Sequence, residues 1–132
     1  MSAKWKEQAL QVLPELKEEI EDAENPYRMW ISIQDAFEDA YAESKNESLI
    51  RRIYGYADWC RQQPSGKTAA DDLGTCVAVC FYEHIPELPA ALNDMPRWFA
   101  KTDVITMKEI LSYHVGEKGY QKILQAYDKK KR

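Results

Sequence analysis

The most apolar stretch of the chain, TAADDLGTCVAVCFYEHI at residues 68–85, is the feature that most constrains its fold. It contains the longest unbroken apolar run, seven residues from Cys76 to Tyr82. Apolar side chains recur in it every three or four residues, which is the spacing of one face of an α-helix. Asp71 and Asp72 would stand in the first turn, where the positive end of the helix dipole favours carboxylates. The stretch therefore predicts a central, largely buried helix that begins at a Thr68 cap.

A β-strand is the alternative for the segment VAVCFY, because valine and aromatic residues suit strands. No second run of this kind exists to pair with it, and a lone strand would leave its backbone N–H and C=O groups unpaired. The apolar run is also far shorter than the ~20 residues that cross a bilayer. We therefore expect a helix, in a protein without a membrane-spanning segment.

Shorter helices are predicted on both sides of the central one. Proline lacks the amide hydrogen that a helix interior needs, so we expect one helix to end near Val12 and another to begin at Pro14, with a single helix kinked at Pro14 as the alternative. Asn25 followed by Pro26 marks the start of an amphipathic helix. Lys45-Asn46-Glu47 interrupts the helical pattern after that helix. Residues 85–96 contain three prolines and are expected to form a loop with at most one turn of helix, around Ala90–Asn93. The remaining helices are predicted over residues 49–60, from a capping box formed by Thr106 and Glu109, and after Gly116.

These segments together predict an all-α fold, a compact bundle of five to seven helices, with stacked helical hairpins as the alternative arrangement. At 132 residues the chain has the length of one ordinary domain, and we assign residues 1–132 to a single helical domain. Residues 129–132, KKKR, are expected to form a solvated basic tail.

Three cysteines, at positions 60, 76 and 80, are an odd number and form no disulfide framework. The first residues, MSAKWKEQALQ, show neither the apolar segment nor the cleavage pattern of a secretory signal. Reduced thiols in a cytoplasmic protein are therefore the simplest expectation.

Acidic residues are concentrated in one part of the chain. Residues 15–43 hold ten carboxylates against Lys17 and Arg28, a net charge of −8, although the whole chain carries only −4. This charge argues against nucleic acid as a partner, because phosphate contacts need Lys and Arg. A basic protein partner is the functional hypothesis, and a solvated face that only keeps the protein soluble is the more common alternative. The candidate partner-binding residues on the outer face of the helix at 25–45 are Asp35, Glu38, Asp39 and Glu43.

Cys76, Cys80 and His84 are spaced i, i+4 and i+8 and would line one face of the central helix. Thiolate and imidazole are good zinc ligands, and Cys60 or His114 could complete a set of four. Buried structural cysteines are the more common explanation, because free cysteine packs as a small hydrophobe. We therefore predict no bound metal and no other cofactor, with Cys76, Cys80 and His84 as the metal-binding alternative.

No pattern in the chain predicts catalysis. The segment PSGKT at residues 64–68 ends like a phosphate-binding loop, but the first glycine of that motif would have to be at position 61, which is Arg61. His84 and His114 have no serine motif or glycine-rich turn near them in the sequence. We expect a protein that is not an enzyme.

Four segments, ENPYRMWISIQDAFEDAY, DWCRQQP, DLGTCVAVCFYEHI and PRWF, resemble a family of small, uncharacterised, all-helical bacterial proteins associated with contact-dependent toxin and immunity gene sets. The resemblance extends from about Leu10 to Leu124. It implies a helical fold and a role as an immunity-type protein. The residues that carry it are aromatic packing residues, and it transfers no functional residues to this chain.

Three functional hypotheses follow. The first is a non-enzymatic protein-binding module, in its most specific form an immunity-type protein that masks a toxin partner through an acidic helical face. The second is a small-ligand-binding or enzymatic helical domain with a pocket near residues 86–98. The third is a structural subunit of a homo-oligomer. The sequence leaves the oligomeric state and the identity of any partner open.

Overall fold

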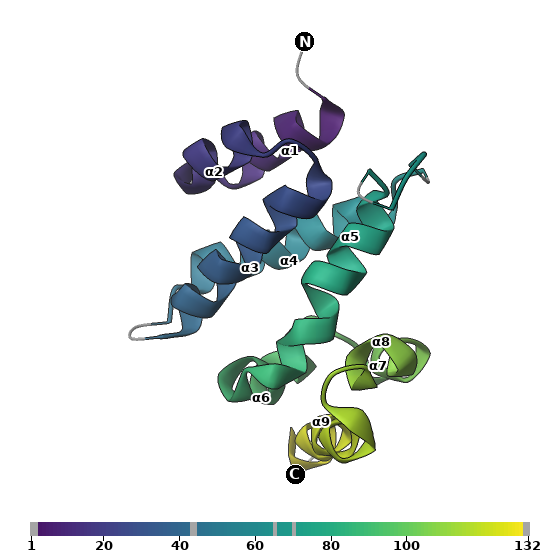
Figure 1. Ribbon diagram of the computed structural model, residues 1–132. Helices are drawn as coiled ribbons and strands as arrows, with labels where there is room; N and C mark the ends of the chain where they lie inside the picture. The colour runs from purple at the N-terminus through teal and green to yellow at the C-terminus, as the bar shows by residue number, and fades with distance from the viewer. Residues whose placement is uncertain (1–2, 43–44, 65, 70, 131–132) are drawn as a thin grey trace. The chain divides into compact units, whose positions relative to one another are not determined.

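The computed structural model describes residues 3–42, 45–64, 66–69 and 71–130. These residues form α-helices, 3-10 helices and turns, without a β-strand, which confirms the predicted all-α fold. They include nine α-helices, more than the five to seven expected, because several are only five to ten residues long. The contacts divide the chain into two compact units, residues 1–81 and residues 82–132 (Figure 1). Each unit has its own packed core and is described separately.

The first unit begins with two short helices separated at a proline. Helix α1 (Lys4–Val12) and the 3-10 helix η1 (Pro14–Leu16) are separated by one residue, Leu13. Helix α2 (Lys17–Asp22) follows η1 directly. Pro14 lies at the first position of η1, where its missing amide hydrogen costs no hydrogen bond. The predicted break at Pro14 is confirmed.

Helices α3 (Pro26–Ala42) and α4 (Glu47–Arg61) also begin where polar side chains predict. Asn25 Oδ1 accepts a hydrogen bond from the Arg28 amide (2.9 Å), and Asn46 Oδ1 accepts one from the Leu49 amide (3.2 Å). Each asparagine thereby satisfies one of the amides that the first turn of a helix leaves unbonded.

The predicted central helix over residues 68–85 is wrong at both ends. Helix α5 covers only Leu73–Cys80, and its cap is Asp72, whose Oδ1 accepts from the Thr75 amide (3.1 Å). The Thr68 hydroxyl instead donates to Asp71 (2.8 Å). Pro86 has no amide hydrogen, and in an α-helix its ring would clash with the Tyr82 carbonyl, so it disfavours an α-helical turn over residues 82–85. The chain continues as a 3-10 helix, η2 (Tyr82–Glu87).

The core of the first unit lies where α3, α4 and α5 pack against one another. Aromatic side chains fill it: the Trp30 ring stacks on Tyr56 (5.5 Å between centroids), and the Phe37 ring meets Phe81 edge to face (4.8 Å). The Tyr56 hydroxyl donates to the Trp5 carbonyl (2.8 Å), which ties α1 to this core. Each aromatic pair adds roughly 0.5–1.5 kcal/mol to the hydrophobic stabilisation.

The second unit consists of η2 and four α-helices, α6 (Pro89–Trp98), α7 (Lys101–Thr106), α8 (Lys108–Ser112) and α9 (Gly116–Lys130). The predicted loop at residues 85–96 is wrong, because α6 extends well beyond the single turn expected around Ala90–Asn93. Pro89 starts α6, and Pro96 lies in its last turn, where it removes a single hydrogen bond. The predicted capping box is also wrong. The Thr106 hydroxyl donates to the Thr102 carbonyl (2.9 Å) at the end of α7, so it does not cap α8.

The last helix supports the second unit, as the sequence predicts. Gly116 adopts a φ of 70°, a conformation that favours glycine, and the chain turns there from α8 into α9. Tyr120, Ile123 and Tyr127 are buried, and the Tyr127 hydroxyl donates to the Phe99 carbonyl (2.8 Å). Helix α9 packs against α6 and α8. The end of the predicted basic tail, residues 131–132, lies outside the described residues.

Candidate functional site

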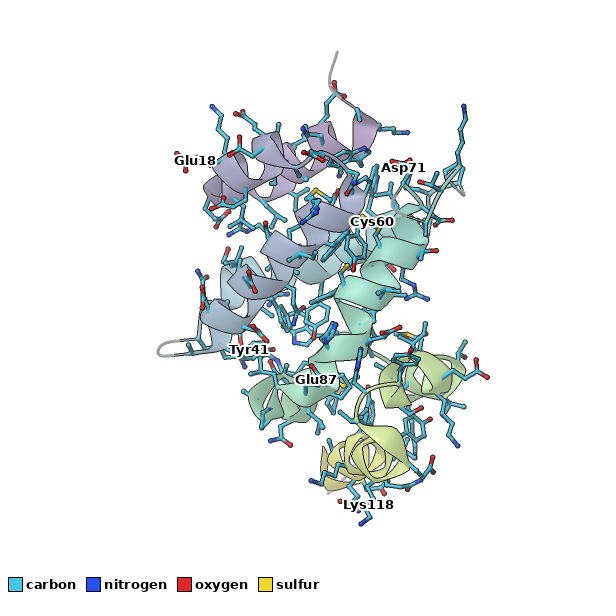
Figure 2. The ribbon with its side chains drawn as sticks, in the orientation of Figure 1. Glu18, Tyr41, Cys60, Asp71, Glu87 and Lys118 are labelled. Carbon is cyan, nitrogen blue, oxygen red and sulfur yellow. The ribbon has the colours of Figure 1, made fainter. Side chains whose placement is uncertain are left out.

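The predicted partner-binding residues lie on the outer side of α3. Asp35, Glu38 and Asp39 are exposed, and none of them forms an ion pair with a described residue. Glu43, the fourth candidate, lies outside the described residues. Glu18 on α2, labelled in Figure 2, also reaches solvent. The carboxylates on this side of the first unit are therefore available to a partner.

Two large hydrophobic side chains share this side of α3 with the carboxylates. Tyr27 and Ile31 are 42% and 41% exposed, and their four-residue spacing continues to Asp35. Glu38 follows three residues later, so all four side chains lie along one side of the helix. We call Tyr27, Ile31, Asp35, Glu38 and Asp39 the acidic face. Sequence reasoning missed Tyr27 and Ile31, although both fall outside the buried stripe of α3.

A hollow of about 600 Å³ adjoins the acidic face. Ile31 belongs to the acidic face and also lines the hollow. The carboxylates of Glu19, Asp22 and Glu24, from α2 and the turn after it, line the hollow as well and could bind a cation. A Lys or Arg side chain fits such a place, because its stem packs on apolar atoms while its charged end meets carboxylates. The lining residues are Glu19, Asp22, Ala23, Glu24, Arg28, Ile31 and Ser32.

The second unit contains a half-open hollow of about 640 Å³ between α9 and the segment from η2 to α6. It combines apolar side chains with Glu87 on one side and Lys118 on the other, both labelled in Figure 2. Lys122 lies one turn after Lys118 and lines the same hollow. Five of the residues that line the hollow fall within residues 86–98, the region of the pocket in the second functional hypothesis. The remaining lining residues are Pro86, Pro89, Leu92, Asn93, Val115, Gly119, Gln125 and Ala126.

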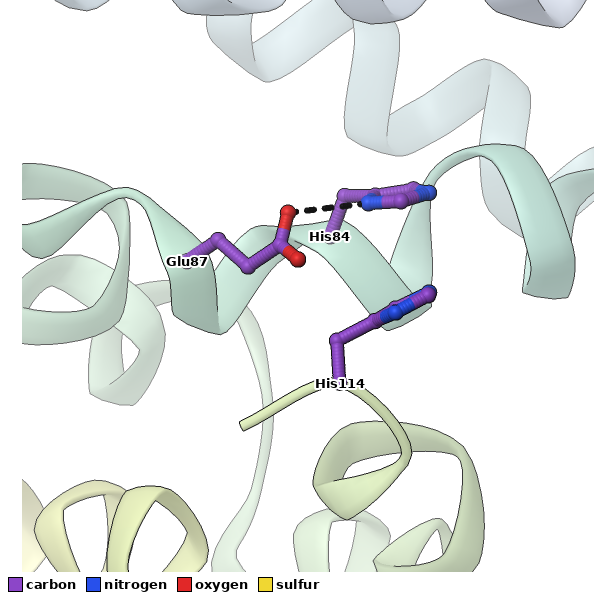
Figure 3. Close-up of side chains that lie close together, drawn as sticks. All are labelled: His84, Glu87 and His114. Atoms are coloured by element: carbon purple, nitrogen blue, oxygen red, sulfur yellow. Dashed lines mark hydrogen bonds and ion pairs between the residues drawn. The ribbon is translucent and has the colours of Figure 1, made fainter. Parts of the chain in front are cut away.

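Two histidines and two glutamates converge at another place in the second unit. The rings of His84 and His114 stack with 4.5 Å between centroids and 19° between planes (Figure 3). Nδ1 of His84 lies 2.9 Å from Oε2 of Glu87, and Nε2 of His114 lies 3.0 Å from Oε1 of Glu83. His84, Glu87 and His114 each offer one ligand atom, and these atoms lie within 4.8 Å of one another.

Local backbone structure brings these four side chains together. In a 3-10 helix, side chains three residues apart eclipse, so η2 places His84 and Glu87 in one row. His114 lies in the turn after α8, and α8 packs against η2. The edge of the Tyr113 ring contacts the His114 ring, with 5.0 Å between centroids. The histidine-x-x-glutamate spacing of residues 84–87 was visible in the sequence, but the approach of His114 was not.

The structure does not place Cys76, Cys80 and His84 on one helix. Cys76 and Cys80 belong to α5, which ends at Cys80, and His84 belongs to η2, so the assumed i, i+4, i+8 alignment is wrong. The Cys76 thiol lies 3.4 Å from the Ala69 carbonyl, and the Cys80 thiol lies 3.8 Å from the Tyr27 carbonyl. Burial raises the pKa of Cys76, and that of Cys60, to about 12. Both thiols therefore stay protonated near neutral pH, unlike the thiolates that bind metal.

No protein-family model, curated protein or solved structure matches the chain. The resemblance to bacterial immunity-type proteins therefore stays an expectation. Among the described residues, no helix combines the length and the apolar character that crossing a membrane requires.

Proposed function

We propose that this protein is a non-enzymatic protein-binding module whose acidic face binds a basic surface of a protein partner. The observation that carries the proposal is the exposure of Tyr27 and Ile31, at 42% and 41%, beside the carboxylates of Asp35 and Glu38. Protein interfaces commonly combine an apolar centre with a polar rim, and tyrosine is enriched at their centres.

Charge and apolar contact have separate roles in this proposal. The net charge of −8 over residues 15–43 attracts a basic partner and raises the association rate. Burial of Tyr27 and Ile31 then slows dissociation, because their apolar surface leaves water on binding. In its most specific form the partner is a toxin that the bound module masks, the immunity-type role implied by the sequence resemblance.

The test begins by using the tag-free protein to capture partners from a lysate of the cells that naturally express it. A captured partner is then purified, and its association with the wild type is measured at several salt concentrations. We expect the triple variant D35K/E38K/D39K to lower the association rate constant at least tenfold at low salt. We expect Y27A/I31A mainly to raise the dissociation rate constant, because this variant removes apolar contact and no charge.

The matched control is the triple variant E109K/E117K/D128K, which makes the same change in net charge on exposed residues of the second unit. Its association rate should stay within about twofold of wild type. An equal decrease of the association rate constant in both triple variants would mean that only the net charge of the protein matters. Unchanged kinetics in D35K/E38K/D39K would exclude the acidic face as the binding surface. Failure of the wild type to retain any partner would contradict the proposed function.

A second candidate function is the binding of a small organic anion in the hollow of the second unit. The observation that favours it is the pairing of Lys118 and Lys122 with apolar Leu92 and Val115 around about 640 Å³, a volume typical of ligand pockets. Neither lysine forms an ion pair with a described residue. An aromatic or aliphatic carboxylate matches this lining when its charged end meets the lysines and its apolar part lies toward Leu92, away from the Glu87 carboxylate.

This candidate is tested by a thermal-shift screen with aliphatic and aromatic monocarboxylates. We expect a hit to lose its effect in L92W, which fills the hollow, and to weaken in K118M/K122M. K4M, which removes an exposed lysine of the first unit, is the control and should keep the full shift. A screen without hits, or a hit unaffected by L92W, would contradict this candidate.

A further inference from the structure

The stacked histidine pair of the second unit has the donor set of a metal site. Imidazole nitrogen and carboxylate oxygen are ligands of zinc and its neighbours among the divalent transition metals. Two histidines and one carboxylate fill three coordination positions and leave a fourth open to water. We propose that His84, Glu87 and His114 bind one zinc ion and that Glu83 positions His114.

The distances in this site are close to those that zinc requires. With ligand bonds of about 2.0–2.2 Å, tetrahedral ligand atoms lie about 3.3–3.6 Å apart. Nδ1 of His84 and Oε2 of Glu87 are already 2.9 Å apart, and all three ligand atoms lie within 4.8 Å of one another. The side chains of His84, Glu87 and His114 are 34%, 46% and 31% exposed. Because the two rings stack with only 19° between their planes, one imidazole must turn before both lone pairs point at the same ion. The partial exposure of the three side chains leaves room for this rotation.

Glu83 supplies the contact that orients a histidine ligand. A metal-bound imidazole commonly donates its other ring N–H to a carboxylate, which fixes the tautomer and strengthens the ligand. Oε1 of Glu83 lies 3.0 Å from Nε2 of His114, and the Glu83 side chain is only 13% exposed. With the proton on Nε2 facing Glu83, Nδ1 of His114 carries the lone pair that binds zinc.

The bound ion would replace a contact between two of its own ligands. Without metal, Nδ1 of His84 and Oε2 of Glu87 already lie at hydrogen-bond distance from each other. Zinc binds a neutral imidazole and a carboxylate, so it would sit between these two atoms in place of their hydrogen bond. The alternative explanation is two separate imidazole–carboxylate pairs that bind no ion, and the experiment distinguishes the two.

The experiment is calorimetric titration of the reduced, tag-free full-length protein with Zn²⁺. We expect one equivalent to bind, and each of H84Q, E87Q and H114Q to weaken the affinity at least tenfold. E83Q should weaken it about tenfold to a hundredfold while leaving one equivalent bound, the usual effect of losing a carboxylate behind a histidine ligand. Circular dichroism of each variant checks that the helices remain.

The controls separate this site from other carboxylates and from the cysteines. E109Q removes an exposed glutamate of α8 outside the cluster, and D35K/E38K/D39K removes the acidic face. Both should keep wild-type zinc affinity, so failure of the proposed partner binding and failure of the zinc site are distinguishable. Binding of less than a tenth of an equivalent of zinc by the wild type would overturn the proposal. Wild-type zinc affinity in E87Q or in H114Q would also overturn it. A thiolate-to-metal absorption band with Co²⁺ would also overturn it.

Discussion

Cys60 and Cys76 show how burial sets the chemistry of single residues in this protein. Both side chains have no exposed surface, and burial raises the pKa of each thiol to about 12. An unfolded cysteine has a pKa near 8.5, so the folded and unfolded states differ over the range between these values. In that range the folded protein keeps two protons that the unfolded chain releases.

The first prediction is a loss of stability in mild alkali. As the pH rises from 8 to 10, the unfolded state binds fewer protons than the folded state, so the free energy of unfolding falls. The expected decrease is on the order of 2 kcal/mol for each thiol. Urea unfolding at several pH values measures it, and C60A should remove about half of the slope with pH.

The control for this titration is V77A, which also truncates a buried side chain but removes no thiol. Its stability should be lower at every pH, because a core methyl contact is lost, while its slope between pH 8 and 10 stays that of wild type. A C60A variant with an unchanged slope would show that this thiol does not contribute to the alkaline loss.

The sequence identified some residues of the candidate sites but not their neighbours. Asp35, Glu38 and Asp39 lie on the outer side of α3 as predicted, because helical spacing alone decides which side of α3 is polar. His84 was a candidate ligand, but it was grouped with Cys76 and Cys80 on a helix that does not extend that far. Its actual neighbour His114 is 30 residues away in sequence, and only the packing of α8 on η2 brings the rings together.

At the scale of elements, the cap of α5 gives the second prediction. Asp72 accepts a hydrogen bond from the Thr75 amide, whereas Thr68 contacts Asp71 outside the helix. D72A should therefore lower the free energy of unfolding by about 1 kcal/mol, the usual cost of losing a cap. T68A should lower it by less than about 0.5 kcal/mol, as a substitution on the surface does. Thermal or urea unfolding compares them, and an equal loss would restore Thr68 as the cap.

The third prediction is that alanine substitutions at two helical glycines change the free energy of unfolding in opposite directions. A Cβ added at Gly55 in α4 would meet no atom within 4 Å, so G55A should stabilise the protein by about 0.5–1 kcal/mol. A Cβ added at Gly119 in α9 would collide with the Val115 side chain, so G119A should destabilise it. Melting temperatures of the two variants measure the effect. A stabilising G119A would mean that the turn at Val115 moves without cost.

Capping residues and prolines predicted helix boundaries correctly where no tertiary contact opposed them. Pro14, Asn25 and Asn46 separate the helices of the first unit as expected, because each acts on the backbone within one turn. The prolines of residues 86–96 predict a loop, but the structure contains helix α6 there. Proline is compatible with the first turn of a helix and costs one hydrogen bond in the last, so α6 can contain Pro89 and Pro96. Only tertiary packing decides such cases.

At the scale of the whole molecule, the core is divided between two sets of helices. The aromatic cluster around Trp30 and Phe37 belongs to residues 1–81, and the core around Ile123 belongs to residues 82–132. Chain length predicts a single helical domain over residues 1–132. Domains are expected to have a core of their own, so each unit could open separately.

The last prediction concerns that independence. Ile53 in α4 and Ile123 in α9 are both fully buried, so replacing either with alanine should cost about 3 kcal/mol. Native-state hydrogen exchange of the full chain then reports where the loss is felt. We expect I53A to lower amide protection in α3, α4 and α5 while α9 stays within about 0.5 kcal/mol of wild type, and I123A to do the reverse.

The reciprocal design makes the result decisive, because each variant is the control for the other. If the contacts within each unit dominate, the free energy of opening changes only in the helices that share the altered core. If I53A lowers protection in α9 as much as in α4, the chain unfolds as one cooperative unit and the prediction from chain length is correct. Separate responses would mean that the acidic face and the histidine cluster lie on independently stable parts, so loss of one site need not disturb the other.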